Sequence, residues 1–156
     1  MSESYEEIFE GETLMRSAPG SRHERICARI HDRVAERLGG NAVSRILSPR
    51  SIVQLSPGTM VRPDLAVVTV ATGKMWLAVE VIDSGDHHPD TVLKKGIYEK
   101  FNVARLWMLD PRYDNVETYH GTAYGLALRG ILAGSERLKE PLLPDFDVKV
   151  ADLFTV

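Results

Sequence analysis

Two almost wholly apolar segments, DLAVVTV at 64–70 and WLAVEVI at 76–82, constrain this chain more than any other feature. Each has the length of a strand, and neither alternates regularly with polar residues, which is typical of strands covered on both faces. Residues 71–74, which include Gly73, predict a hairpin turn between them. The two segments therefore predict the centre of a sheet with helices on both sides.

Helical patterns lie before and after this hairpin. Residues 22–38 carry apolar side chains four positions apart, and Ser21 with Glu24 has the spacing of a capping box. Residues 90–101 show a second helical pattern, and the apolar segment 104–110 predicts a strand that returns parallel to 76–82. The predicted fold is α/β, with a mixed sheet flanked by helices. Further strands are expected at 43–48, 52–56, 115–120 and 123–129, the last two paired around Gly121.

Length and composition indicate how the chain is organised. Its 156 residues suit one domain, which we expect to span 21–156 after a polar lead-in at 1–20. The start is acidic and lacks a secretory pattern, and no apolar run approaches the ~20 residues of a membrane span, so we expect a cytoplasmic protein. The net charge of −3 does not by itself indicate nucleic-acid binding, although most of the acidic excess lies before Arg16. The body of the chain is therefore close to neutral.

The hairpin brings two acidic side chains together. With the turn near residues 72–73, Asp64 lies opposite residue 80 or 81, and cross-strand β-carbons are roughly 5 Å apart. Glu80 interrupts an apolar strand, where an uncompensated carboxylate costs several kcal/mol. A proton, a basic partner or a divalent cation can offset that cost. Mg²⁺ and cations like it prefer oxygen ligands of this kind.

The helix at 90–101 adds an amine to this pair. Lys94 lies near the start of the helix, which in a crossover begins close to the end of the preceding strand. Asp90 and Tyr98 lie on the same row as Lys94; Asp90 also suits a helix start, and Tyr98 suits either the site or the core. Two carboxylates, a lysine and a metal ion are suited to phosphodiester hydrolysis.

Structural roles remain open for the same residues. Asp64 can pair with Arg62 at the start of a strand, and Glu80 can form a buried ion pair with Lys94. Cys27 and the histidines indicate packing or surface positions rather than ligands.

Four pieces of the chain together resemble a known family. They are RPDLAVV, LAVEVIDS, the D-x-x-x-K-x-x-x-Y row of Asp90, Lys94 and Tyr98, and VARLWMLDP. Their combination is similar to the Uma-type family of restriction endonucleases, within the PD-(D/E)xK superfamily. The resemblance covers about residue 20 to about residue 154. It implies a restriction-endonuclease-like core.

The resemblance also implies a set of metal ligands. Asp64 corresponds to the aspartate of the PD pair, and Glu80 to the acid of the second motif. The main-chain carbonyl of Val81 is implied as a further ligand of Mg²⁺ or Mn²⁺. Glu24 can supply another acid, as first-helix acids do in some superfamily members, although its capping role is an alternative.

The catalytic lysine departs from the superfamily pattern. It often follows the second acid by two residues, where this chain has Ile82. The resemblance places it instead on the next helix, at Lys94, while Lys95 points roughly 100° away.

Three functional interpretations follow from these residues. The first is a metal-dependent endonuclease acting on nucleic acid, with DNA as the expected substrate and a homodimer as the expected assembly. The second is a nuclease fold that serves as a non-catalytic binding or assembly module. The third is a structural protein in which Glu80 and Lys94 form a core salt bridge.

Overall fold

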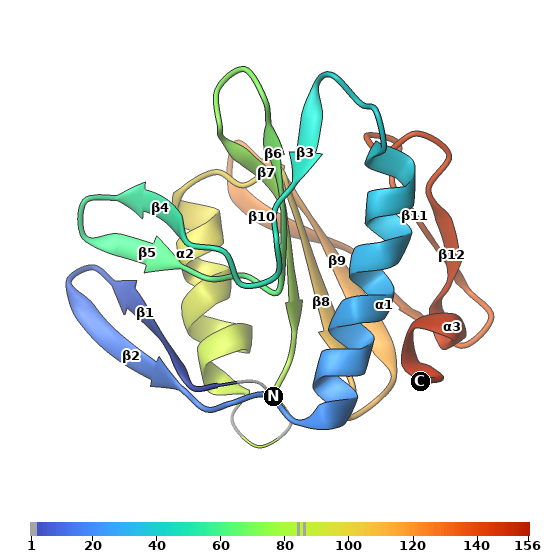
Figure 1. Cartoon of the computed structure of the whole chain (residues 1–156), viewed down its shortest axis with the longest axis horizontal. Coiled ribbons are helices and arrows are strands. Elements are labelled where there is room, and N and C mark those ends of the chain that lie inside the picture. Colours follow the sequence, from blue (N-terminus) through green and yellow to red (C-terminus); the bar gives the residue numbers. More distant parts are fainter. Residues whose placement is uncertain (1–2, 84, 86) are drawn as a thin grey trace.

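A six-stranded mixed sheet lies at the centre of the computed structural model, which describes residues 3–83, 85 and 87–156 (Figure 1). The two apolar segments form adjacent antiparallel strands, and the second of them pairs in parallel with the strand that follows the second helix. The mixed sheet expected from the sequence is confirmed. In spatial order its strands are β10 (Gly125–Ala133), β9 (Asn115–Thr122), β8 (Arg105–Asp110), β7 (Met75–Val81), β6 (Leu65–Thr69) and β3 (Ser44–Ile46).

Helices cover both faces of this sheet, as Figure 1 shows. Helix α1 (Ser21–Leu38) packs on one face, and α2 (Lys95–Lys100), preceded by the π-helical turn η1 (Pro89–Lys94), packs on the other. Alternate residues of β7 serve the two faces: Val79 joins the core cluster of α1, and Ala78 joins the cluster of α2. Burial on both faces explains why the strand has an almost uninterrupted apolar sequence.

The start of α1 differs from the expected capping box. The N-cap residue is Gly20, which has no side-chain cap, and the Glu24 amide donates to its carbonyl at 3.0 Å. The Glu24 carboxylate instead accepts a hydrogen bond of 2.6 Å from Arg50. A charge-assisted contact of this kind is stronger than a bond to a neutral amide, so the tertiary partner prevails over the local one.

The first twenty residues contain a β-hairpin, which the sequence analysis treated only as a polar lead-in. Glu10 and Gly11 form its turn with φ values of 51° and 85°, the left-handed pair that suits a tight hairpin. The hairpin belongs to a second, four-stranded sheet, which lies beside α2 in Figure 1. Its strands, in spatial order, are β2 (Glu12–Arg16), β1 (Tyr5–Phe9), β5 (Thr59–Val61) and β4 (Val53–Ser56).

The C-terminal segment packs back on the central sheet. It forms β11 (Arg137–Lys139), β12 (Asp147–Lys149) and the short helix α3 (Val150–Phe154). Its apolar side chains are buried, and Phe146 stacks on Trp107 with ring centroids 5.3 Å apart. Among the helices of the described residues, none has the length and apolar character needed to cross a membrane.

The β9–β10 hairpin turns later than expected, after Thr122 rather than around Gly121. Gly121 lies within β9, where an added β-carbon would come within 2.8 Å of the Val103 carbonyl oxygen. The glycine therefore serves a close approach between backbones and not a turn.

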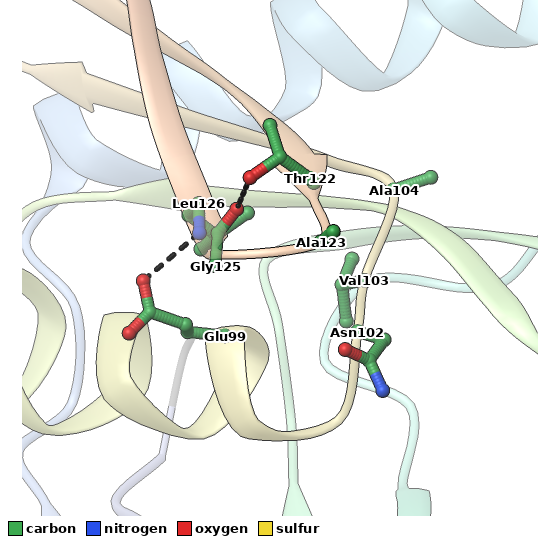
Figure 2. A pocket seen from close by; sticks show the side chains of 9 residues that line it. Glu99, Asn102, Val103, Ala104, Thr122, Ala123, Gly125 and Leu126 are labelled. Atoms are coloured by element: carbon green, nitrogen blue, oxygen red, sulfur yellow. Dashed lines mark hydrogen bonds between the residues drawn. The ribbon is translucent and has the colours of Figure 1, made fainter.

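Gly125 follows that turn and borders a cavity of about 300 Å³ at the C-terminal end of α2. Its φ is +113°, and an added β-carbon would lie 2.6 Å from an oxygen of Glu99, which accepts the Leu126 amide at 2.9 Å (Figure 2). We expect Gly125→Ala to lower the free energy of unfolding by about 1–3 kcal/mol because the backbone is strained and the Glu99 contact is displaced. Urea unfolding measures this change. Gly134→Ala, at φ +60° with no heavy atom within 4 Å, separates backbone strain from the contact with Glu99.

Candidate active site

Asp64 and Glu80 meet at one end of the β6–β7 pair. Leu65 lies opposite Val79, and the same register places Asp64 opposite Glu80, as the hairpin pattern predicted. Both side chains are buried, with 4% and 2% of their surfaces exposed. The partners of Asp64 lie on the α1 side of the sheet, whereas those of Glu80 lie on the α2 side. The two acids therefore belong to two neighbouring groups of polar side chains.

Glu80 is held by two side chains from the helix beyond it. Lys94 Nζ lies 2.6 Å from Glu80 Oε2, and the Tyr98 hydroxyl donates to the same oxygen. Lys94 and Tyr98 are both fully buried. Lys94 also lies 2.8 Å from Glu7 Oε2, so the described ion pairs of Lys94 join it to Glu80 and Glu7 and not to Asp64.

The N-terminal hairpin completes this group of residues. Glu7 accepts hydrogen bonds from the Arg62 amide at 2.7 Å and from Arg16 at 2.7 Å. Arg16 also bonds to Asp90 at 2.8 Å, and Asp90 accepts the Asp83 amide at 3.2 Å. Asp90 therefore bonds within this network rather than only at a helix start.

Glu7 and Arg16 were missed by the sequence analysis, which treated the acidic N-terminus as solvated. Both are buried, with Glu7 completely enclosed. The Glu10-Gly11 dipeptide between two short segments with apolar residues was the available signal for the hairpin that carries them.

Asp64 binds toward the start of α1. Its Oδ2 accepts the Val81 amide at 2.8 Å, and its Oδ1 accepts a bond of 3.1 Å from Arg50. The sequence offered Arg62 as an ion-pair partner of Asp64, but the described arginine partner is Arg50. Arg50 also bonds to Glu24. Glu24 is thus joined to Asp64 through a shared guanidinium group.

His23 lies beside this group, although the sequence gave no reason to single it out. Its Nε2 is 2.6 Å from the Val81 carbonyl oxygen and 3.8 Å from Asp64 Oδ2. On the other side of the ring, Nδ1 lies 3.5 Å from Cys27 Sγ and 3.8 Å from Glu24 Oε1. The imidazole therefore lies beside two of the three protein groups that the family resemblance implies as metal ligands, the Val81 carbonyl and Asp64.

Burial and ion pairing act in opposite directions on the pKa values here. Burial raises the pKa of Glu80 to about 8, against the attraction of Lys94. Burial alone would lower the pKa of Lys94, but the Glu80 carboxylate holds that pKa well above its usual range. Burial also opposes ionisation of Glu7, but Lys94 lowers its pKa. Lys94 is therefore charged and Glu7 ionised, and Glu80 is the acid that retains a proton near neutral pH.

The ion pairs around these acids leave negative charge in excess. The described network joins five carboxylates to three cationic side chains. Because Glu80 retains its proton near neutral pH, the metal-free network has four ionised carboxylates for three cations. A divalent cation that displaced the Glu80 proton would balance all five carboxylates. The carboxylates are Glu7, Glu24, Asp64, Glu80 and Asp90, and the cations are Arg16, Arg50 and Lys94.

The raised pKa of Glu80 makes the stability of the metal-free protein depend on pH. The folded protein retains a proton on Glu80 up to pH 8, whereas the unfolded chain releases it near the ordinary value of 4.5. The folded state therefore binds more protons between these limits, and the free energy of unfolding falls as pH rises through this window. With a chelator present, we expect a lower melting temperature at pH 8 than at pH 6. The Glu80→Gln protein should show a smaller difference.

The donor atoms at this end of the sheet fit a divalent cation. Three donor groups from separate segments lie close together: the Asp64 carboxylate, the Val81 carbonyl and the His23 ring. A cavity of about 340 Å³ borders His23 and the residues that follow β7. Its lining residues are Gly20, Ser21, Arg22, His23, Ile82, Asp83 and Pro111.

Comparisons with known proteins identify a family and a similar fold. A family model, Uma2, described as "Putative restriction endonuclease", matches residues 2–151. Among solved structures, the crystal structure of a "putative nuclease belonging to DUF820" from Anabaena variabilis ATCC 29413 is similar at a TM-score of 0.79 and 13% sequence identity. The similarity covers 96% of this chain and 89% of the other, and it shows a shared nuclease fold. No curated protein matches the chain.

Proposed function

This chain belongs to the Uma2 family, and we propose that it is a Mg²⁺- or Mn²⁺-dependent endonuclease that hydrolyses phosphodiester bonds in DNA. One observation carries the proposal: more carboxylates than cations gather at the end of β6 and β7, and a cavity borders His23 beside them. Structural networks that need no ligand usually balance their charges, because an unpaired buried carboxylate is costly.

The ion would be held by Asp64, Glu80 and the carbonyl of Val81. A bound Mg²⁺ or Mn²⁺ supplies a Lewis acid that neutralises phosphate charge and lowers the pKa of water. The Val81 amide already fixes the Asp64 carboxylate at 2.8 Å. Lys94 and Tyr98 both bind Oε2 of Glu80, which orients the carboxylate, and Oε1 would be the oxygen offered to the ion.

Lys94 positions Glu80 and adds a fixed positive charge near the reacting phosphate. In the described arrangement it is enclosed between Glu7 and Glu80. Direct contact between its ammonium group and a phosphate requires the loss of one of these ion pairs. Of the two acids that pair with Lys94, Glu7 lies on the N-terminal hairpin, in a separate sheet. Its displacement would leave the central sheet intact.

The cavity beside His23 is the proposed entrance for a phosphodiester. Arg22 lies at its edge, where 41% of the side chain is exposed and its bonds go to Asp114 and to main-chain carbonyls. An exposed guanidinium can exchange such partners for a phosphate. We also propose a homodimer, because cleavage of both strands of a duplex requires two such sites.

A non-catalytic role for the same fold is the second candidate. The complete burial of Lys94 favours it, because the lysine of a working site has to approach the substrate. Under this alternative the ionic network stabilises the fold, and nucleic acid or a protein partner binds without being cleaved.

A cleavage screen separates the two candidates. Plasmid, oligonucleotide and branched DNA are incubated with the wild-type protein and Mg²⁺ or Mn²⁺, beside Asp64→Asn and the control Asp147→Asn, an exposed acid that pairs with Arg137 away from the site. The proposed function predicts metal-dependent cleavage by the wild type and by Asp147→Asn, and its loss in Asp64→Asn. Equal cleavage by Asp64→Asn would show contamination or a different site, and binding without cleavage would favour the non-catalytic role.

A further inference from the structure

We propose that His23 is a direct ligand of the metal ion, through Nε2, and that the site therefore selects Mn²⁺ over Mg²⁺. This inference rests on the proposed function, because it concerns the same ion. His23 Nε2 lies 3.8 Å from Asp64 Oδ2 and 2.6 Å from the Val81 carbonyl, so an ion bound by those two oxygens would lie next to the ring nitrogen.

Hydrogen bonding defines the tautomer of His23 before an ion binds. A carbonyl oxygen can only accept, so the contact with Val81 requires a proton on Nε2. In the neutral ring Nδ1 is then an acceptor, which matches its contact of 3.5 Å with Cys27 Sγ. Burial raises the pKa of the Cys27 thiol well above its ordinary value, so the sulfur keeps its proton and can donate.

Coordination through Nε2 requires the other tautomer. The ring proton leaves Nε2 and a proton is taken up at Nδ1, with no net change in the charge of the imidazole. Two acceptors lie on that side of the ring, Cys27 Sγ at 3.5 Å and Glu24 Oε1 at 3.8 Å. A metal-bound histidine usually donates its second N–H to a carboxylate or carbonyl. Glu24 Oε1, at 3.8 Å, is the carboxylate oxygen that would take this role after a small approach. Glu24 is thereby a positioning residue and not a ligand.

The donor set then determines the choice of metal. Mg²⁺ strongly prefers oxygen ligands and gives up water reluctantly, so an imidazole adds little to its binding. Mn²⁺ accepts nitrogen more readily, and affinity for mixed nitrogen and oxygen sites rises along the divalent series beyond it. Cys27 Sγ also lies near this group, since the ligand atoms of His23, Cys27 and Asp64 are all within 4.8 Å of one another. We assign the sulfur to a hydrogen bond with Nδ1, which it contacts at 3.5 Å, and not to the ion.

Calorimetric titration of the wild-type protein with Mn²⁺ alone and with Mg²⁺ alone tests the inference without any cleavage assay. We expect His23→Gln to lower Mn²⁺ affinity at least about tenfold while changing Mg²⁺ affinity little. His31→Gln is the matched control, since His31 lies on the same helix with its Nε2 3.4 Å from the Leu47 carbonyl. It should bind both ions as the wild type does.

A spin-echo measurement on Mn²⁺ bound to the wild-type protein covers the case in which His23→Gln does not fold. Nitrogen coupling that changes on ¹⁵N-histidine labelling is the expected result, and its absence overturns the inference. Unchanged Mn²⁺ affinity in His23→Gln, or an equal loss for both ions, also overturns it. If Mn²⁺ binds through His23 but no DNA is cut, the proposed activity fails and the ligand assignment stands. If the wild type binds neither ion, both fail.

Discussion

Lys94→Met is expected to destabilise the metal-free protein by about 3–5 kcal/mol, the usual cost of removing one partner from a buried ion pair. The substitution keeps the volume of the side chain but removes the ammonium group between Glu7 and Glu80, so Glu80 loses its cationic partner and Glu7 retains only Arg16. For a chain of this size the melting temperature should fall by roughly 10–15 °C, which calorimetry or circular dichroism measures.

The same variant should respond more strongly to a divalent cation. Loss of Lys94 raises the negative charge of the network, so Mn²⁺ should recover part of the lost stability even though cleavage is abolished. Lys100→Met is the control, because Lys100 is 60% exposed and pairs with Glu10 on the surface, where ion pairs contribute little. A Lys94→Met protein as stable as the wild type would contradict the described network.

Mn²⁺ is expected to raise the melting temperature of the wild-type protein by about 5–10 °C at a concentration near 100 times its dissociation constant. An ion that binds only the folded state adds about 2.7 kcal/mol under that condition, which corresponds to this shift for a domain of this size. Glu80→Gln should abolish the shift, because the amide retains the shape of the side chain but supplies no negative charge to the ion.

Glu140→Gln is the matched control for that experiment. Glu140 is also a buried acid, 3% exposed, and it forms an ion pair of 2.6 Å with Arg105 outside the site. Its replacement should lower the starting melting temperature yet leave the Mn²⁺ shift intact. A shift that survives in Glu80→Gln, or that is lost equally in Glu140→Gln, would mean that the ion binds elsewhere.

Strong local patterns predicted the framework of this protein. The i+4 apolar stripe gave helix α1 to within a residue at its start, and the two apolar segments gave the β6–β7 hairpin and its register. Both depend on periodicity and turn residues, which act over a few positions in the chain. The approach of Lys94 to Glu80 could be predicted as well, because a crossover helix begins near the strand that it leaves.

The rest of the site depends on contacts between distant segments. Glu7 is separated from Lys94 by more than half of the chain, and nothing in an acidic stretch distinguishes a buried glutamate from a solvated one. His23 gave no signal because a single histidine on a helix is usually structural, and its meaning comes from Val81, which lies on another element. The partner of Asp64, Arg50, is likewise set by the tertiary fold.

Anomalous diffraction from a crystal soaked in Mn²⁺ tests the central claim most directly. The account predicts one manganese peak per protomer at the end of β6 and β7, within coordination distance of an Asp64 oxygen, the Val81 carbonyl and Glu80. A soaked crystal with no peak at that end of the sheet, or with manganese bound only to surface acids, would contradict it.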